Sequence, residues 1–366
     1  MKQKRECFTA VDLCCGAGGL TLGLKRAGFN VVAGVELYPE IAKTYKANHP
    51  EVKLLIKNVR EVTGEELFEL TGLKSIDLLA GCPPCQGFSK LTDKFHRIDP
   101  RNNLVLEMAR LAQELSPKIV MMENVSGLAT RGKPILDELV RRLERLGYIV
   151  NKEVLQLANY GVPQSRRRLV LLAGKGFYVP MPKRTHCEQG DKEAKLKPWL
   201  TLKDVLKGNK EPVTLAQALR EGGPEKFNWH VVRDLTEKSI QRYKVTRPGD
   251  SRYSLPMSLR PKCHQNSDKG FPNVYGRISW NKVSPTITGG CTTPAKGRFG
   301  HPEQLRTLSV REAATIQTFP KNFALITNYM DTACDLVGNA LPYKFACKTA
   351  RTCLSILKEH EGGNNE

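Results

Sequence analysis

The sequence predicts an α/β protein whose larger domain is a doubly wound, mostly parallel sheet covered by helices, beside a smaller domain of short strands and loops. Three observations support this prediction. Short apolar runs alternate with helical stretches from Phe8 to Gly174, the pattern is lost after Gly174, and helical periodicity returns near residue 308. Strand–helix alternation is typical of a parallel sheet, because each crossover helix covers the strands that it connects.

Apolar runs that stop at Gly, Cys or acidic residues predict the strands of the sheet: Phe8–Cys15, Val31–Leu37, Ile76–Gly81, Ile119–Asn124 and Leu169–Gly174. Between them, apolar residues recur at helical spacing over 104–115, and Pro117 ends that helix. Pro134 begins another helix, and Gly147 lies just beyond its end.

The domain boundaries follow from the change of pattern. We expect a first domain at 1–175, completed by a C-terminal helix within 331–366, and a second domain at 176–330 that consists mainly of β-strands and loops. Helical segments are expected at 308–318 and from Gly338 to Leu357.

Positive charge is concentrated in the middle of the chain. Residues 175–300 hold 24 basic and 11 acidic residues, a net of +13 within the formal total of +20. A segment that lies on phosphates concentrates basic side chains in this way. No apolar run approaches the ~18–20 residues of a membrane span, the first residues lack the features of a signal peptide, and the eleven cysteines follow no repeating spacing. We therefore expect a cytoplasmic protein without membrane contact or disulfide framework.

A glycine-rich turn follows the first predicted strand. Asp12–Gly19 reads DLCCGAGG, and a strand that ends in glycines before a helix lets backbone amides approach a ligand closely. Glu36 ends the second strand, where a carboxylate accepts hydrogen bonds from both ribose hydroxyls. The pair indicates an adenosine-containing ligand, although a plain strand-to-helix turn gives the same glycine pattern.

A cysteine follows two prolines at the end of the Ile76–Gly81 strand. In GCPPCQGFS the prolines stiffen the chain and favour an outward Cys85 at the carboxyl edge of the sheet. A thiol there is a candidate nucleophile if its pKa is lowered. Three alternatives stay open: a buried small hydrophobic residue, a redox pair with Cys82, and a metal ligand. No second cysteine pair or histidine pair completes a metal site, so we expect no bound metal ion.

Polar residues also follow the next two strands. Glu123 ends an apolar strand, and loss of solvation there favours the neutral form of a carboxyl group, which suits a proton donor. An ordinary loop acid is the alternative. Gln164, Arg166 and Arg168 occupy alternate positions and so share one face of a short predicted strand. The arginines of this segment either are solvated, contact phosphates or point into a cleft.

The order of these pieces resembles the DNA cytosine-5 methyltransferases of bacteria and phages. Six motifs carry the resemblance, from residue 8 to about 355: the glycine loop, Pro84-Cys85-Gln86, Glu123-Asn124-Val125, Gln164 to Arg168, REAATIQTFP from Arg311, and Gly338-Asn339-Ala340.

The resemblance implies an S-adenosylmethionine-dependent methyltransferase fold with a smaller, mainly β/loop target recognition domain at 176–330. It implies that Cys85 adds to carbon 6 of a cytosine flipped out of duplex DNA, so that carbon 5 accepts the methyl group. It further implies that Glu123 bonds ring nitrogen 3, that Arg168 holds the 2-carbonyl, and that Arg166 orients Glu123.

The resemblance also assigns binding residues. For S-adenosyl-L-methionine it implies Asp12, Cys14, Gly16, Gly18, Gly19, Glu36, Leu37, Asn58, Val59, Gly81, Asn339 and Ala340. For DNA it implies Gln86, Ser89, Asn124, Gln164, Thr286 and Thr288. Two residues depart from the family pattern, which usually has Phe at Cys14 and often has Asp at Asn58; for Asn58 a plain turn residue is the alternative. We expect a nucleoid-associated monomer that modifies double-stranded DNA, with a cognate restriction endonuclease acting separately.

Three other functions are compatible with parts of this pattern. A tRNA cytosine methyltransferase would share the fold, but that branch resembles PPCQPFT, whereas the chain has PPCQGFS, and Cys-Phe-Thr is absent from 175–330. A non-catalytic DNA-binding homologue would lose the nucleophile or the acid, and both are present. A CxxC oxidoreductase would need Cys82 as much as Cys85.

Overall fold

The computed structural model describes residues 7–84, 100–265 and 270–362. The chain forms two compact units, the first made of 1–160, 167–184 and 341–366 and the second of 161–166 and 185–340. The divisions expected after 175 and after 330 lie nine and ten residues before the observed ones, which fall after 184 and after 340. No pattern in the sequence indicated that the short segment 161–166 belongs to the second unit.

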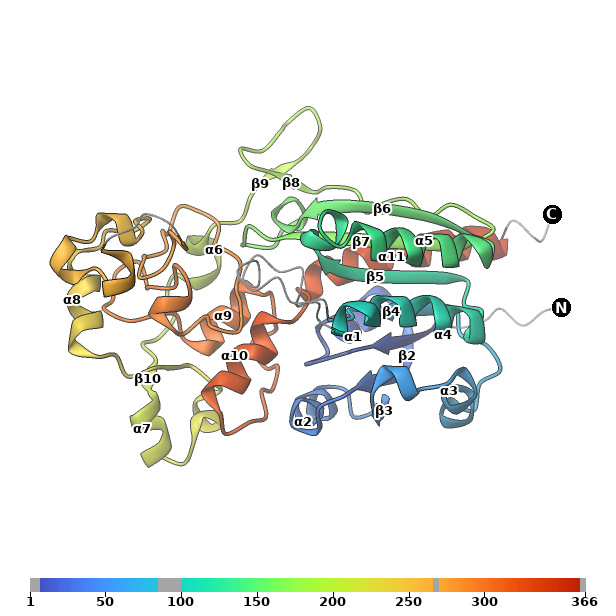
Figure 1. The fold of residues 1–366 in the computed structure, drawn as a ribbon, viewed down its shortest axis with the longest axis horizontal. Helices are drawn as coiled ribbons and strands as arrows, with labels where there is room; N and C mark the ends of the chain where they lie inside the picture. The colour runs from blue at the N-terminus through green and yellow to red at the C-terminus, as the bar shows by residue number, and fades with distance from the viewer. Residues whose placement is uncertain (1–6, 85–99, 266–269, 363–366) are drawn as a thin grey trace. The chain divides into compact units, whose positions relative to one another are not determined.

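A seven-stranded sheet forms the centre of the first unit (Figure 1). Its strands are β1 (Thr9–Leu13), β2 (Asn30–Glu36), β3 (Lys53–Ile56), β4 (Leu78–Gly81), β5 (Ile119–Val125), β6 (Tyr148–Gln156) and β7 (Arg167–Lys175). The spatial order is β3-β2-β1-β4-β5-β7-β6, and β7 runs antiparallel to both of its neighbours while the other pairs are parallel. The predicted doubly wound sheet is confirmed, with one antiparallel hairpin at its edge.

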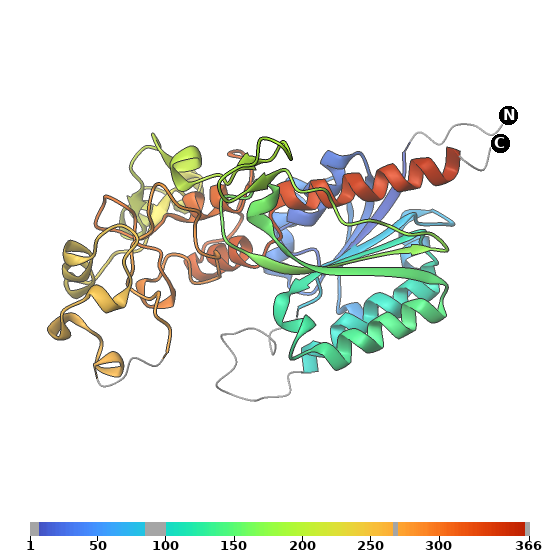
Figure 2. The same ribbon diagram turned by 90° about the horizontal axis from the view of Figure 1, so that it is seen from above.

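Helices cover both faces of this sheet (Figure 2). They are α1 (Gly19–Ala27), α2 (Pro39–Asn48), α3 (Gly64–Thr71), α4 (Glu107–Leu115), α5 (Lys133–Arg145) and α11 (Tyr343–Gly362). α1 packs against α11 on one face, where Gly23 allows contact because an added Cβ would lie 2.4 Å from Ala346 Cβ. α4 packs against α3 and α5 on the other face. Right-handed crossovers explain this division, since the chain winds outward from β1 in both directions.

The core of the first unit matches the apolar periodicity of the sequence. Met108, Leu111 and Leu115 of α4 are buried, as are Leu136 and Leu139 of α5. A 3-10 turn over Pro100–Leu106 precedes α4, so the regular helix begins later than its apolar pattern.

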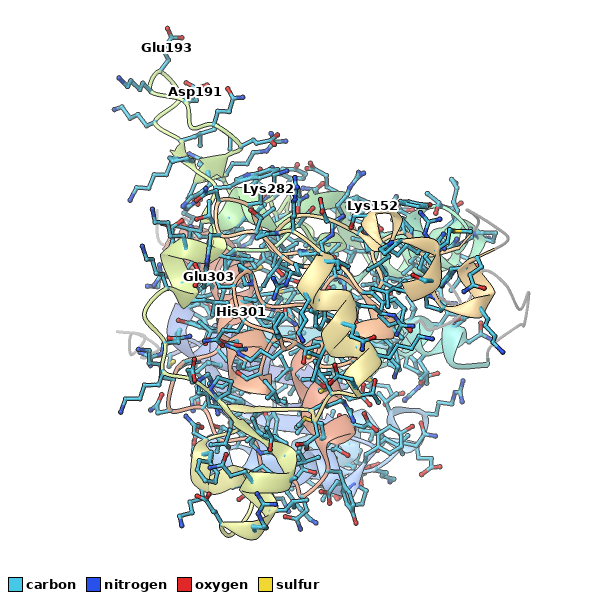
Figure 3. The ribbon with its side chains drawn as sticks, turned by 90° about the vertical axis from the view of Figure 1, so that its left-hand side faces the viewer. Lys152, Asp191, Glu193, Lys282, His301 and Glu303 are labelled. Atoms are coloured by element: carbon cyan, nitrogen blue, oxygen red, sulfur yellow. The ribbon has the colours of Figure 1, made fainter. Side chains whose placement is uncertain are left out.

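The second unit consists mostly of loops and short elements. Its strands are β8 (His186–Cys187), β9 (Lys197–Pro198), β10 (Val213–Thr214) and β11 (Val231–Val232), and its helices are α6 (Leu202–Leu206), α7 (Leu215–Arg220), α8 (Glu237–Val245), α9 (Val310–Ile316) and α10 (Met330–Gly338). Loops dominate as expected, but the named strands are only two residues long and helices hold more of the described residues. Asp191 and Glu193 lie at the tip of the loop between β8 and β9, which projects from this unit (Figure 3).

The closing helix differs from its expected bounds. The sequence placed one helix from Gly338 to Leu357, whereas α10 ends at Gly338 and α11 begins at Tyr343. Pro342 explains the break, because proline lacks the backbone donor that a continuous helix requires. Among the described residues, no helix is long and apolar enough to cross a bilayer.

Candidate active site

The carboxyl ends of β1 and β4 lie side by side at the point where the strand order reverses. Leu13 pairs with Gly81, and the amide of Cys82 donates to the carbonyl of Leu13 at 3.2 Å. An added Cβ on Gly81 would lie 2.9 Å from the sulfur of Met108 and 3.1 Å from the Leu13 carbonyl, so glycine permits this close packing. Ligands of doubly wound sheets bind at such a position.

The turn after β1 has a left-handed backbone at Cys14, Gly16 and Gly18, with φ of 56°, 55° and 91°. Gly18 packs tightly, because an added Cβ would lie 2.5 Å from the ring of His49. His49 is buried, and its Nε2 lies 3.1 Å from the Gly18 carbonyl. Gly16 faces open space, with no atom within 4 Å of an added Cβ. The turn therefore packs against His49 at Gly18, whereas it faces open space at Gly16.

Glu36 at the end of β2 is fixed by two backbone amides. Gly16 donates to its Oε2 and Tyr38 to its Oε1, both at 2.9 Å. Burial raises the pKa of Glu36 above its ordinary value, and the amide hydrogen bonds oppose that shift. The carboxylate is thus tied to the glycine turn, which brings together two residues that the sequence predicted as one ligand site.

Asp12 lies under the turn and is fully buried. The hydroxyl of Thr21 donates to its Oδ2 at 2.7 Å and lies 2.9 Å from the hydroxyl of Tyr45. The other oxygen, Oδ1, has no hydrogen-bond partner among the described residues. Burial raises the pKa of Asp12 to about 7, with the nearby Glu36 acting in the same direction and the Thr21 hydrogen bond against it.

The carboxyl edge of β2 and β3 exposes apolar side chains beside Glu36. Leu37 is 47% exposed and Ile56, which pairs with Glu36, is 41% exposed. Asn58 caps the following 3-10 turn, its side chain accepting from the amide of Arg60 at 3.2 Å, and Val59 is buried. Leu37 therefore presents an apolar surface, and Asn58 caps a turn, while its contact with the methyl donor stays a prediction.

Glu123, near the end of β5, forms an ion pair with Arg168, near the start of the antiparallel neighbour β7. Both side chains are mostly buried, and Arg168 Nε lies 2.8 Å from Glu123 Oε1. Burial lowers the pKa of Arg168, while the carboxylate of Glu123 and the thiol of Cys82 oppose that shift. Arg168, for which the sequence predicted a contact with the base, thus contacts Glu123; the orienting role expected of Arg166 stays a prediction.

Asn124 fixes the segment that leads to Cys85. Its side-chain amide donates to the carbonyl of Pro83 at 3.0 Å, and its oxygen accepts from the amide of Val125 at 2.8 Å. One N–H of the Asn124 amide is thus used within the protein, and the DNA contact that the sequence assigned to Asn124 stays a prediction. The neighbouring Cys82 has a pKa well above its ordinary value, because of burial and then of the carboxylates of Glu123 and Asp12. Cys82 is therefore a protonated thiol.

Gln164 and Arg166 organise the second unit. Gln164 donates to Gln317 at 2.7 Å and accepts from the amide of Ile287 at 2.9 Å. Arg166 donates to the carbonyls of Ile287 at 2.9 Å and Gly338 at 3.2 Å. Both side chains are buried. These bonds join three predicted motifs of that unit into one network.

The remaining predicted residues of the second unit lie around this network. Thr286 donates through its hydroxyl to the carbonyl of Ser165 at 2.7 Å, and Thr288 is partly exposed. Gly338 packs against the backbone of Thr288, where an added Cβ would lie 2.2 Å from the carbonyl carbon. Asn339 is exposed and Ala340 is half-buried.

Sequence reasoning missed several residues that hold the site. Thr21, Tyr45 and His49 support the glycine turn and Gln317 completes the Gln164 network. The only signal for these residues in the sequence is the amphipathic pattern around Tyr45, which indicates that this side chain is buried. The predicted residues Cys85, Gln86 and Ser89 lie outside the described residues.

The comparisons with known proteins agree with this geometry. The family of C-5 cytosine-specific DNA methylases matches residues 8–355. The type II methylase M.HgiDII of Herpetosiphon aurantiacus is 36% identical over 95% of both chains, and the type II methyltransferase M1.HphI of Haemophilus parahaemolyticus is 32% identical over 95% of this chain and 87% of its own. A DNA modification methyltransferase encoded within an E. coli prophage superposes with a TM-score of 0.72 at 22% identity, covering 96% of this chain and 99% of its own. The S. pombe Dnmt2 methyltransferase gives a TM-score of 0.66 at 16% identity over the same shares, which shows the fold alone.

The sheet order and the family match together define the class of protein, which is an S-adenosylmethionine-dependent methyltransferase. The chain belongs to the C-5 cytosine-specific DNA methylase family. It is thus a DNA (cytosine-5) methyltransferase that takes its methyl group from S-adenosylmethionine. The residues present fit that donor: Glu36 would accept from the ribose hydroxyls, Leu37 and Ile56 would contact the adenine, and Gly16 faces open space beside the turn.

Proposed function

We propose that this enzyme methylates a cytosine flipped out of duplex DNA, through a covalent bond between Cys85 and carbon 6 of the base. The observation that carries the proposal is the register of β4 and β5. Gly81 pairs with Met122, so the next residues on the two strands are Cys82 and Glu123. The segment that leads to Cys85 therefore starts beside the acid, and Asn124 ties Pro83 to the same strand.

The chemistry explains why a thiol and an acid are needed together. Carbon 5 of cytosine is too weak a nucleophile to take a methyl group directly. Addition of the Cys85 thiolate to carbon 6 turns carbon 5 into an enamine carbon, while Glu123 bonds ring nitrogen 3 and relieves the charge that develops there. S-adenosylmethionine supplies the methyl group as an electrophile on a sulfonium. Loss of the carbon-5 proton then expels Cys85 as a thiolate and restores the aromatic ring.

Arg168 holds Glu123 in place for this step. Its Nε contacts Glu123 and its Nη1 donates to the carbonyl of Arg167 at 2.9 Å, which leaves further N–H groups of the guanidinium to bond the 2-carbonyl of the base. Arg166 acts through the backbone of the second unit, which it holds at Ile287 and Gly338.

The second unit, which includes most of the basic stretch 175–300, recognises the target sequence in our proposal. The type II methyltransferases among the relatives support a role as the modification enzyme of a restriction-modification system. We further propose that the enzyme acts as a monomer and that the cognate nuclease is a separate protein.

Bisulfite sequencing of DNA from a methylation-free host that expresses the chain tests this function. We expect 5-methylcytosine at every copy of one short sequence. Methyl transfer into tRNA but not into duplex DNA would contradict the proposal and favour the RNA-acting alternative.

A further inference from the structure

One lobe of the second unit combines positive charge with exposed apolar side chains. This α8 lobe runs from Thr236 to Pro272 and includes α8 and the turns after it, drawn in yellow and light orange in Figure 1. Its described residues, 236–265 and 270–272, include seven basic and two acidic ones. A solvated basic surface needs no apolar groups, so the apolar groups of this lobe require an explanation.

The exposed apolar residues are more frequent here than elsewhere. Tyr253 is 44% exposed, Met257 is 53% exposed and Phe271 is 44% exposed. With Val245 they make four of the twelve exposed large apolar side chains among the described residues, although the lobe is about a tenth of the chain. Clusters of exposed apolar groups mark surfaces that bind a partner.

The arginine side chains of Arg252 and Arg260 hold these exposed residues in place. The guanidinium of Arg252, itself buried, lies 4.8 Å from the centre of the Tyr253 ring. Arg260 donates to the carbonyls of Tyr253 and Leu255, each at 2.9 Å. The guanidinium groups of Arg252 and Arg260 therefore stabilise the conformation of these turns.

Two more hydrogen bonds brace the remainder of the lobe. Gln265 donates to the carbonyl of Met257 at 3.3 Å, and the amide of Arg252 donates to the carbonyl of Pro272, next to Phe271, at 3.3 Å. The turns that carry all three exposed residues are thus tied together. A surface that is rigid before binding loses little entropy when it binds.

Charge decides the kind of partner. The positive charge of the lobe suits a polyanion, and its exposed tyrosine, methionine and phenylalanine suit the apolar surfaces of stacked bases. Duplex DNA combines both features. Proteins insert such side chains between base steps or lay them on bases, while basic neighbours hold the phosphates. We propose that Tyr253, Met257 and Phe271 contact the base pairs around the target cytosine and set the sequence preference of the enzyme. This inference rests on the proposed function and assigns its specificity to one lobe.

The test uses the full chain with Tyr253→Ala, Met257→Ala and Phe271→Ala, singly and combined. Tyr178→Ala is the matched control, because Tyr178 is also exposed but lies in the first unit. Methylation of a DNA library with randomised positions around the target is measured by bisulfite sequencing. We expect the triple variant to lose 10-fold or more of its rate on the preferred sequence, or to accept altered neighbouring bases. The control should behave as wild type.

Binding measurements separate this role from loss of folding. The triple variant should keep the thermal midpoint, the affinity for S-adenosylmethionine and the salt dependence of DNA binding, because the lysines of the lobe remain. Unchanged rate and unchanged sequence preference in the triple variant would overturn the inference. So would unchanged methylation with an altered oligomeric state, which would assign the surface to a second copy of the chain. If the wild type methylates no DNA, the proposed function itself fails.

Discussion

The side-chain amide of Asn124 donates to the carbonyl of Pro83 at 3.0 Å, which ties the end of β5 to the segment that precedes Cys85. The adjacent residue, Glu123, points its carboxylate to Arg168. One strand therefore holds both the acid and the backbone that leads to the nucleophile. Small errors in such a geometry lower reaction rates strongly, since the reacting atoms must be aligned.

The first prediction concerns the hydrogen bond from Asn124 to Pro83. Asn124→Ala removes the donor to Pro83 and leaves a buried carbonyl unsatisfied, at a cost of about 1–3 kcal/mol. We expect kcat to fall roughly 5- to 150-fold while the affinity for S-adenosylmethionine stays unchanged, because Asn124 lies apart from the glycine turn. Single-turnover methylation and equilibrium binding of the donor measure the two effects. A weaker donor affinity with normal kcat would contradict the assignment.

The second prediction concerns the acid. Glu123→Gln keeps the shape of the side chain but removes the carboxyl group that bonds ring nitrogen 3 in the proposed step, so that step should slow by about 10²-fold or more. Glu153→Gln is the control, because Glu153 is exposed on the neighbouring hairpin strand β6. Pre-steady-state rates on cognate DNA give the answer. An unchanged rate for Glu123→Gln removes this residue from the mechanism.

The third prediction concerns the glycine turn. Gly18→Ala combines a left-handed backbone with a Cβ that would lie 2.5 Å from His49. Gly72→Ala has a similar φ of 72° at the end of α3 and meets no atom within 4 Å, so it measures backbone strain alone, about 1–2 kcal/mol. We expect only Gly18→Ala to abolish binding of S-adenosylmethionine, as read by calorimetry. Equal binding by the two variants would count against the turn as part of the donor site.

The fourth prediction uses two buried groups with opposite pH dependence. Burial, reinforced by Lys25, lowers the pKa of His49 from 6.5 to about 4, so its contribution to stability is present above pH 6.5 and is lost as pH falls towards 4. Burial raises the pKa of Asp12 from 3.8 to about 7, so its contribution is present below pH 3.8 and is lost as pH rises towards 7. Across each of these pH ranges the group changes the free energy of unfolding by on the order of 3–4 kcal/mol.

The variants His49→Gln and Asp12→Asn remove one dependence each. Relative to wild type, His49→Gln should become more stable as pH falls from 6.5 to 4, and Asp12→Asn should become more stable as pH rises from 4 to 7. Urea unfolding at several pH values measures both slopes, and the other titrating groups cancel in the differences. Slopes of the same sign would contradict this description of the turn.

The sequence predicted the sheet well where strands are buried on both faces. β1, β4 and β5 are continuous apolar runs, and their ends carry the residues that chemistry requires. β6 was missed because Lys152 and Glu153 interrupt its apolar pattern, and the strand is largely exposed at the edge of the sheet. β3 was missed because it is a short strand at the edge of the sheet in which no residue is fully buried.

Residue types identified the site, but contacts between distant positions could not be read from them. The partner of Asn124 is a backbone carbonyl, which leaves no side-chain signal in the sequence. His49 reaches Gly18 across 31 positions for the same reason. Arg166 and Arg168 have the same side chain and share the predicted face of one strand, so only the fold shows that Arg168 pairs with Glu123 while Arg166 holds Ile287.

The central claim is that Cys85, and no other cysteine, bonds the target base. Duplex DNA that carries 5-fluorocytosine at the target tests it directly, because fluorine at carbon 5 blocks release of the enzyme. With S-adenosylmethionine present, we predict a stable protein–DNA adduct for the wild type and for Cys82→Ser, whose native thiol is protonated, and none for Cys85→Ala, which should still bind DNA. An adduct that survives Cys85→Ala, or its absence in the wild type, would contradict the account.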